Sequence, residues 1–334
     1  MMCRKCLVPR LVTRRVAWLV LLAAAMLPAG AERSLAQSYP SGQIKILVGF
    51  PPGGTTDIIA RDVGQELEKA WHQTVIVENR AGANGALAAG QLAKLPPDGQ
   101  TLMMIVSGHI TNPLVSPGAG YDALKDFTNI SLLASSPLLI FAHPGFAAND
   151  IKGAIALAKD KPNTIGYATP GVGSIQQLSM ELLSYLSGAK FLHVPYRGGA
   201  PALNDTIAGH VPLSVLSVFQ VLPLIQDGKL KPLAVTDLKR SDVLPNVQTV
   251  AEAGVADYEA SLLFGLIAPA GLPPAVLARI NAEVTRIINA PEMQKKLAAQ
   301  GVLPIASTPA DFTAVIKREQ DKWAQVIKAS NIKE

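Results

Sequence analysis

The stretch that decides the fold is IKILVGFPPGGTTDIIARDVG, residues 44–64. It begins with an apolar, β-branched run, which is typical of a buried strand. Two prolines and two glycines at 51–54 then end the strand and allow a positive φ. Thr55 and Thr56 are suited to cap a following helix, and Asp57 stands in its first turn, beside the positive end of the helix dipole. The helix has an apolar face formed by Ile59, Val63 and Leu67.

A strand, a glycine turn and a helix start together form a natural site for an anion. The first N–H groups of a helix have no acceptor within the helix, and the dipole adds partial positive charge there. The alternative is a plain strand-to-helix connection that binds nothing, and the turn alone does not decide between the two.

Residues 1–36 are predicted to be a signal peptide. A basic segment precedes the apolar run Val16–Leu27, which is too short to span a bilayer. Small residues follow, and although Ala29-Gly30-Ala31 also fits a signal-peptidase site, we expect cleavage after Ala36. An ordinary Sec signal is favoured over a twin-arginine signal at Arg14-Arg15. The protein is therefore expected in the periplasm.

Removal of this leader changes the charge and the cysteine content. It carries six of the 30 Lys+Arg and one of the 25 Asp+Glu, which leaves 24 of each in a mature chain of 298 of the 334 residues. A neutral chain lacks the basic surface that nucleic acid requires. Cys3 and Cys6 leave with the leader, so no disulfide, no Cys-ligated metal and no lipid anchor is expected. No later apolar run is long enough for a membrane span, and the length suffices for one or two cores.

Short apolar strands alternate with amphipathic helices along the mature chain. Further strands are predicted at 74–77, 101–106, 138–142, 164–168, 191–194, 213–218, 233–236 and 262–268. Helices are predicted at 151–159, 176–186 and 274–288, with others ending near 95 and 208 or beginning at 291 and 309. This alternation with short turns indicates an α/β architecture, and no fixed-period repeat interrupts it.

The opening design returns at Thr169–Ser174, where a strand, a glycine turn, a hydroxyl cap and a helix follow one another. Two such junctions so far apart in the chain indicate two lobes that face each other. Ligands of open α/β sheets lie at the carboxyl ends of the strands, where these loops fall. Ser107 and His109 also stand where a strand ends. A lone histidine is more often structural, but this position keeps His109 as a candidate ligand contact.

Several kinds of chemistry are missing from the sequence. The first glycine turn lacks the lysine of a phosphate-binding P-loop, and no G-x-G-x-x-G follows the first strand. Ser174 stands one place late for a nucleophile elbow. The five histidines form no metal-binding pair, so neither a metal nor a cofactor is expected. Arg80 and Arg197 are suited to clamp a carboxylate, but a salt bridge or a solvated loop arginine is the favoured interpretation of both.

Distinctive motifs follow one another from about Tyr39 to the C-terminus. They are IKILVGFPPGGTTDIIAR (44–61), VIVENRAGANG (75–85), PPDGQTL (96–102), YATPGVGSIQQL (167–178), HVPYRGGAPALNDTIAGHV (193–211), GKLKPLAVTDLKRSDVLPNVQTVAEAG (228–254), GLIAPAGLP (265–273), STPADF (307–312) and KWAQVIKAS (322–330). In these motifs the chain resembles the periplasmic receptors of the tripartite tricarboxylate transporter family, the Bug type.

The resemblance implies a two-lobed type II periplasmic-binding-protein (Venus flytrap) fold with mixed sheets flanked by helices. Residues 38–137 plus 264–334 would form lobe 1, and residues 138–263 would form lobe 2. It implies a monomer that binds a small di-, tri- or aromatic carboxylate in the cleft and delivers it to a two-component membrane permease. With Ser107 and His109 from the strand end, the ligand-binding residues would be Phe50, Gly53, Gly54, Thr55, Thr56, Asp57, Thr169, Gly171, Gly173, Ser174 and Ser217.

One departure from the family pattern concerns the ligand. Many relatives carry an aspartate where this chain has Leu216, which removes a charge near the expected cleft and argues against amino-acid ligands. Together with Val218 and Phe219, this residue suggests a less polar cleft, suited to an aromatic or longer aliphatic acid. The alternatives to a transport receptor are a ligand-presenting partner of a membrane sensor kinase and a secreted hydrolase, for which no nucleophile–base pair is found. We therefore expect no enzyme.

Overall fold

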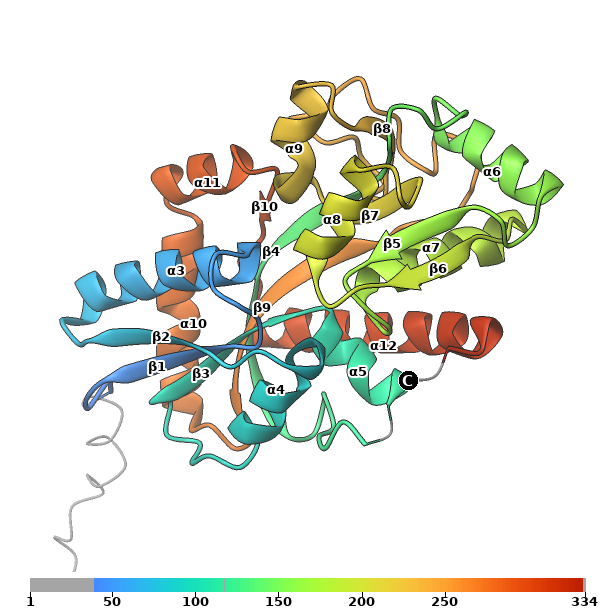
Figure 1. Ribbon diagram of the computed structural model, residues 1–334. Helices are drawn as coiled ribbons and strands as arrows, with labels where there is room; N and C mark the ends of the chain where they lie inside the picture. The colour runs from blue at the N-terminus through green and yellow to red at the C-terminus, as the bar shows by residue number, and fades with distance from the viewer. Residues whose placement is uncertain (1–38, 117, 333–334) are drawn as a thin grey trace, which may run out of the picture. The chain divides into compact units, whose positions relative to one another are not determined.

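The computed structural model describes residues 39–116 and 118–332, so the predicted signal peptide lies outside the described residues. The sheet begins with three parallel strands, β1 (Ile44–Val48), β2 (Val75–Asn79) and β3 (Thr101–Val106). β9 (Ser261–Pro269) pairs antiparallel with β3, and the long strand β4 (Phe127–Ala142) pairs with β9. We call this set, with the short edge strand β10 (Leu303–Pro304) on the other side of β4, the first half-sheet (Figure 1).

The second half-sheet begins on the same strand β4. Its C-terminal part, from Leu138, pairs antiparallel with β7 (Leu213–Ser217) on one side and β8 (Lys231–Val235) on the other. β5 (Gly166–Thr169) lies parallel to both β7 and β6 (Leu192–Pro195). The strand order across both halves is therefore β2-β1-β3-β9-β4-β7-β5-β6.

Ten α-helices and one short 3₁₀ turn connect the strands in the described part of the chain. They are α3 (Thr55–Trp71), η1 (Ala83–Gly85), α4 (Ala86–Leu92), α5 (Gly108–Val115), α6 (Ile151–Asp160), α7 (Ile175–Ser187), α8 (Gly199–Ile207), α9 (Val218–Gln226), α10 (Pro274–Ile288), α11 (Pro291–Ala298) and α12 (Pro309–Ser330). None of the helices searched in this part is long and apolar enough to cross a membrane.

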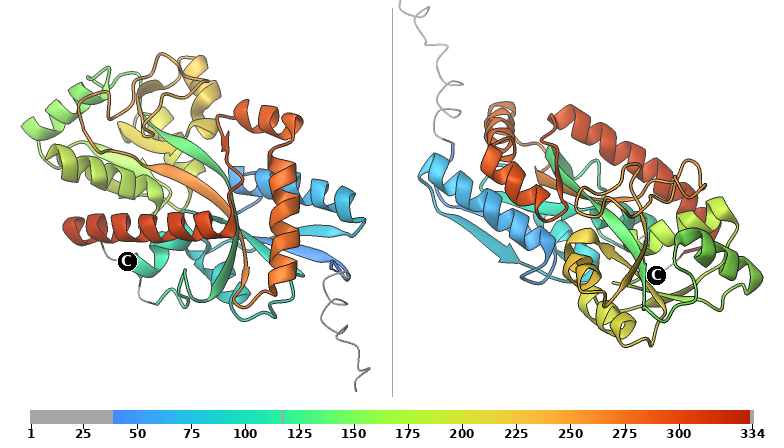
Figure 2. Two further views of the ribbon diagram at one scale, coloured as in Figure 1. Left: turned by 180° about the vertical axis from the view of Figure 1, so that it is seen from behind. Right: turned by 90° about the horizontal axis from the view of Figure 1, so that it is seen from above.

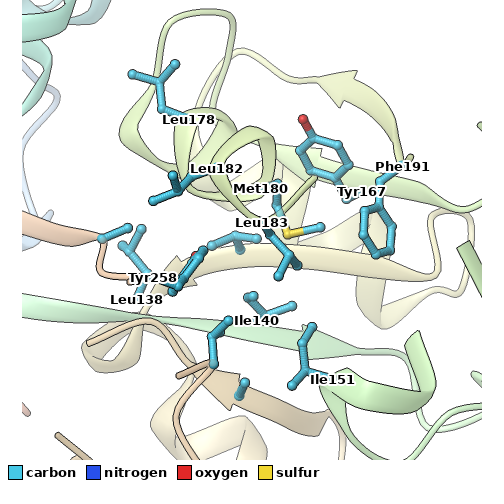
Figure 3. Close-up of a cluster of buried hydrophobic side chains, with 14 of the residues drawn as sticks. Leu138, Ile140, Ile151, Tyr167, Leu178, Met180, Leu182, Leu183, Phe191 and Tyr258 are labelled. Carbon is cyan, nitrogen blue, oxygen red and sulfur yellow. The ribbon is translucent and has the colours of Figure 1, made fainter. Parts of the chain in front are cut away.

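Each half-sheet has a core of its own. In the first, Leu47, Met103 and Ile267 of the strands pack with Leu92 of α4. In the second, strand residues such as Ile140 and Val215 pack against α6 and α7, and Figure 3 shows Leu138, Tyr167, Leu183 and Tyr258 gathered in this core. Aliphatic and aromatic side chains make up most of both cores, whose burial is the dominant stabilising contribution.

The helix α12 joins both cores. Phe312 and Ile316 near its start belong to the first core, whereas Trp323 and Val326 belong to the second. Figure 2 shows α12 running beside α7 at one end and reaching the strands of the first half-sheet at the other. Gly265 of β9 makes room for the helix, because a Cβ there would lie 2.1 Å from Phe312 Cζ. The prediction of a helix that begins at residue 309 is confirmed.

The loops at the carboxyl ends of the parallel strands lead into two sets of helices. β1, β2 and β3 lead into α3, η1 and α5, and β5, β6 and β7 lead into α7, α8 and α9. Carboxyl-end loops carry the ligand sites of open α/β sheets. A ligand-binding site is therefore expected at these six loops.

Candidate ligand-binding site

The loop from β1 to α3, which we call the first corner, leaves a helix start without a cap. A Cβ on Gly49 would lie 2.6 Å from Gly85 Cα, so the two backbones touch. Gly53 has a φ of 85°, which favours glycine. The N-cap is Gly54, and no side chain caps the helix, so the prediction that the threonines would cap it is wrong. The free N–H groups of the first turn remain available to an anion.

Thr55 and Thr56 are the first two residues of α3 rather than its caps. They are 6% and 7% exposed, and neither hydroxyl hydrogen-bonds to another described residue. Neither Oγ1 is among the fully buried polar atoms that lack a partner, so both hydroxyls can be reached from solvent. Two reachable hydroxyls beside free N–H groups are the arrangement expected of a site that binds a ligand from outside the chain.

The Asp57 carboxylate hydrogen-bonds to groups of the protein around the first corner. Its Oδ2 accepts hydrogen bonds from the Gly53 N–H and from Arg61 Nε, both at 2.9 Å, and its Oδ1 accepts one from Asn79 Nδ2 at 2.9 Å. Arg61 also forms an ion pair with Oδ1. Burial alone would raise the pKa of Asp57, but these hydrogen bonds and the charge of Arg61 outweigh it and leave the pKa below its usual value. Asp57 thus shapes the loop with both oxygens engaged, and its predicted direct contact with a ligand has no support in this geometry.

The loop from β5 to α7, the second corner, is capped by its own side chains. Ser174 Oγ accepts from the Gln177 N–H at 3.3 Å and donates to the Gly171 carbonyl at 2.7 Å. Gln177 Oε1 accepts from the Gly173 N–H at 2.8 Å. The predicted hydroxyl cap at Ser174 is confirmed. Anion binding at this corner is thereby limited to the N–H groups at the very start of α7.

Thr169 lies fully buried below the second corner. Its Oγ1 lies 2.6 Å from His193 Nε2 and accepts a hydrogen bond from the Gly171 N–H at 3.3 Å. Burial lowers the pKa of His193 to about 4, so the ring is neutral near pH 7. Thr169 therefore supports the loop from beneath, and Gly171 is the more accessible of the two.

Ser107 and His109 lie at the end of β3, but not in the loop that the sequence predicted. A short helix, α5, begins at Gly108. Ser107 Oγ donates to the Ser261 carbonyl at 3.3 Å and accepts from the Leu263 N–H at 3.0 Å, which ties this point to β9. The residue is 1% exposed.

The His109 ring is enclosed in the first core. It stacks on Tyr121 at 4.9 Å and meets Phe127 edge-on at 4.8 Å between ring centroids. Neither ring nitrogen has a hydrogen-bond partner in the described structure. Burial lowers the pKa of His109 to about 3, and the nearby backbone of Ala123 opposes this only in part. The expectation of an open histidine at a strand end is therefore corrected, because its ring has no route to a ligand in this structure.

Sequence reasoning missed two residues of α5, Thr111 and Asn112. Asn112 Nδ2 donates to the Asn84 carbonyl at 3.0 Å, and Asn84 Nδ2 donates back to Asn112 Oδ1 at 3.0 Å. Thr111 Oγ1 donates to the Gly173 carbonyl at 3.1 Å. Adjacent residues of one helix thus contact loops of both half-sheets. The available signal was the small, polar run after β3, which reads as a loop because of Asn112-Pro113.

Ser217 is the N-cap of α9 at the third loop of the second half-sheet, 1% exposed, with its Oγ 3.4 Å from Gln220 Oε1. The neighbouring Leu216 and Val218 are fully buried with Leu139, away from solvent. The predicted apolar lining of a cleft by Leu216 and Val218 is therefore wrong. Phe219 is half-buried and remains a candidate.

The two candidate arginines differ. Arg80 forms an ion pair with Glu78, which also pairs with Lys45, so its salt-bridge interpretation is confirmed. Arg197 is exposed just before α8 and has no ion pair among the residues that the structure describes. Within the same residues, no group of three or more His, Cys, Asp or Glu side chains could hold a metal ion.

The fold and these two corners define a class, the two-lobed solute-binding proteins. The chain is similar to a solved structure described as Rpa4515 of R. palustris with adipate, with a TM-score of 0.82 and 33% identity over 88% of this chain and 99% of that one. It is similar to periplasmic binding protein BugD, with a TM-score of 0.79 and 30% identity over 88% and 99% of the two chains. It is also similar to MatC (Rpa3494) from Rhodopseudomonas palustris with bound malate, with a TM-score of 0.78 and 30% identity over 86% and 100%. The predicted two-lobed α/β fold is confirmed.

Within that class the family follows from the sequence. Residues 59–332 match the family model described as "Tripartite tricarboxylate transporter family receptor" (TctC). The chain belongs to this family of periplasmic solute-binding receptors, which confirms the resemblance seen in its motifs. It is a receptor family and not a family of enzymes.

Proposed function

We propose that this protein binds a small di- or tricarboxylate between its two half-sheets and delivers it to the two-component membrane permease of a tripartite tricarboxylate transporter. The observation that carries the proposal is the start of α3, where free N–H groups lie beside the solvent-accessible hydroxyls of Thr55 and Thr56. The Asp57 carboxylate accepts from Gly53, Arg61 and Asn79, which leaves the first N–H groups of the helix available to an anion from outside the chain. Membership of the receptor family gives that anion its class, a carboxylate.

Two lobes are part of the proposal. Lobe 1 comprises residues 38–137 and 264–334, and lobe 2 comprises residues 138–263. The strand pairing supports the first boundary, because β4 pairs with β9 up to Pro137 and with β7 from Leu138 onward. The proposed second boundary, at residue 264, lies within β9, whose pairing with β4 begins at Ser261 opposite Pro137.

The acid would be held by charge-assisted hydrogen bonds. A carboxylate oxygen at the start of α3 accepts from N–H groups and threonine hydroxyls, with Gly53 and Gly54 allowing close approach, while the half-buried Phe50 ring borders the loop. The start of α7 and the Ser217 loop approach from lobe 2. Closure excludes water and strengthens these bonds, and the ligand selects the closed population through its contacts with the second lobe.

Dicarboxylates are the first acids to test. Similar solved structures hold adipate and malate, which are both dicarboxylates. The case for an aromatic acid has weakened, because Leu216 and Val218 are enclosed in a core and only Phe219 remains half-buried.

The decisive experiment is a thermal-shift screen of the purified mature protein against acetate, benzoate, malate, adipate and citrate, followed by calorimetric titration. A ligand at about 100 times its Kd should add roughly 2.7 kcal/mol to the unfolding free energy. Stabilisation by none of the di- or tricarboxylates would contradict the proposal.

A variant localises the site. Gly54 has ordinary extended φ and ψ values of −79° and 166°, and a Cβ there would meet nothing nearer than 4.0 Å. Gly54→Leu should therefore fold normally and lose acid binding. Gly42→Leu is the matched control, because Gly42 also has open space around it and lies at the opposite end of β1. Unchanged affinity in Gly54→Leu would place the acid elsewhere.

Two other roles make different predictions. A sensor-kinase partner would be captured by its receptor domain only in the presence of ligand, and that role is compatible with transport. A hydrolase would turn over an ester or phosphate. In the described residues no histidine hydrogen-bonds to Ser174, whose hydroxyl is already engaged by Gly171 and Gln177, so we propose no enzymatic role.

A further inference from the structure

We propose that Thr111 of α5 is a positioning residue that fixes the separation between the first and second corners and so selects the length of the dicarboxylate. The inference rests on the proposed function, because it concerns two corners that hold one acid between them. Thr111 lies outside the set of ligand contacts that the sequence indicates.

On the side of the first corner, α5 is fastened through the loop at Asn84-Gly85. The reciprocal hydrogen bonds between Asn84 and Asn112 are both 3.0 Å long. Gly108 allows this approach, since a Cβ there would lie 2.7 Å from Asn84 Nδ2. Gly85 in turn touches the backbone of Gly49, at the start of the first corner.

On the side of the second corner, α5 is fastened to Gly173. The Thr111 hydroxyl donates to the Gly173 carbonyl at 3.1 Å, and its distances to the carbonyls of Ser107 and Gly108 within its own chain segment are longer, 3.4 and 3.5 Å. A threonine in a helix ordinarily bonds back to its own preceding turn. Val115, one turn later, packs on the same glycine, with side-chain atoms 3.3–3.4 Å from the position of a Cβ.

These contacts form a continuous path between the corners. It runs from Gly49 through Gly85, Asn84 and Asn112 to Thr111 and Gly173, and each step is a backbone contact, a peptide bond or a hydrogen bond. Thr111 is fully buried, so water does not replace its bond. Whenever these bonds are formed, this path without long, flexible side chains sets one spacing of the corners, and the closed population with that spacing favours an acid of one length.

The test compares Thr111→Val, which keeps the shape and removes the hydroxyl, with Thr111→Ser, which keeps the hydroxyl. Affinities are measured by calorimetry for malonate, succinate, glutarate, adipate and pimelate. For the wild type we expect the affinity to change on the order of tenfold per methylene around the best acid. Thr111→Val should flatten this profile to less than about threefold per methylene, because one buried hydrogen bond corresponds to a factor of about five. Thr111→Ser should keep the wild-type profile.

A second variant is needed in case Thr111→Val does not fold. Val115→Ala removes an apolar contact with Gly173 instead of a hydrogen bond, and it should flatten the same profile of affinity against acid length. A purely structural role would lower the melting temperature of these variants and leave the ratios between acids unchanged, and that result would overturn the inference. If the wild type binds no acid of the series, the proposed function fails and the inference falls with it. If the wild type discriminates and both Thr111→Val and Val115→Ala discriminate equally well, only the inference fails.

Discussion

Replacing His109 by leucine should remove a large part of the acid sensitivity of the fold. The ring is buried between Tyr121 and Phe127, and its pKa in the folded protein is about 3 against an ordinary value of 6.5. The unfolded chain therefore takes up a proton at this ring before the folded chain does. The stability that depends on a neutral His109 is complete above about pH 6.5 and is lost as the pH falls from there toward about 3.

The magnitude follows from the two pKa values. At about pH 5 an unfolded histidine lies roughly 1.5 units below its pKa, whereas the folded one remains neutral, and each unit corresponds to about 1.36 kcal/mol. His109 alone should thus cost about 2 kcal/mol of unfolding free energy between about pH 7 and about pH 5. Leucine has a similar volume and no buried nitrogen, so His109→Leu should change stability near pH 7 by less than about 1.5 kcal/mol.

The assay is urea unfolding of the wild type and His109→Leu at both pH values, with His72→Asn as a control at an exposed histidine that forms no ion pair with another described residue. Asparagine also adopts the left-handed backbone conformation of His72. The loss of stability on acidification should be about 2 kcal/mol smaller in His109→Leu than in the wild type, and His72→Asn should match the wild type. Equal losses in all three proteins would refute the buried, neutral ring. The same variant should keep the wild-type affinity for acids, and a folded His109→Leu that no longer binds would restore His109 as a ligand contact.

Three further substitutions test other parts of the fold. Asp57→Asn should lower the unfolding free energy by roughly 1–3 kcal/mol near pH 7, because it removes the charge that pairs with Arg61 and weakens the hydrogen bonds from Gly53 and Asn79. Since the pKa of Asp57 is depressed in the folded state, the difference in unfolding free energy from wild type, measured by urea unfolding, should narrow as the pH falls below about 4. Trp323→Ala should cost about 3–5 kcal/mol in calorimetric unfolding, because the indole is fully buried in the second core, and an effect below about 1 kcal/mol would contradict that packing. Gly49→Ala should cost about 1–3 kcal/mol and weaken acid binding, because its Cβ would lie 2.6 Å from Gly85 Cα; wild-type stability and affinity together would show that the two loops are not in contact.

The first corner was predictable because its signals are local. The apolar run, the glycines and the periodic Ile59, Val63 and Leu67 lie within one short stretch, and β1 and α3 begin where these signals place them. The cap was not predictable to the residue. Gly54, Thr55 and Thr56 are all acceptable residues at an N-cap. Which of them becomes the cap depends on the hydrogen bonds that Asp57 accepts from Gly53 and from Asn79, and Asn79 belongs to another strand.

Other elements could not be predicted because their partners are far away in sequence. The first part of β4 contains Asn129 and several serines, which obscure a strand pattern, but it is buried against β9. α5 was hidden by Pro113, and its role depends on Thr111 meeting Gly173 in the other half-sheet. A helix of this length has little intrinsic stability and forms because its surroundings hold it. No local pattern contains that information.

The charges around the first corner explain why backbone groups carry the site. Arg61 is paired with Asp57, and Lys45 and Arg80 share the carboxylate of Glu78, so each of these nearby cations already has a partner within the protein. An acid that arrived at this loop would meet no free ammonium or guanidinium group among them. It would meet helix N–H groups that are fixed in direction before the ligand binds and two hydroxyls that rotate toward it, and the preorganised N–H donors lose little entropy on binding. Residues 37–334 carry 24 basic and 24 acidic side chains, and an anion site at α3 is compatible with this balance, because the attraction comes from oriented dipoles and not from net charge.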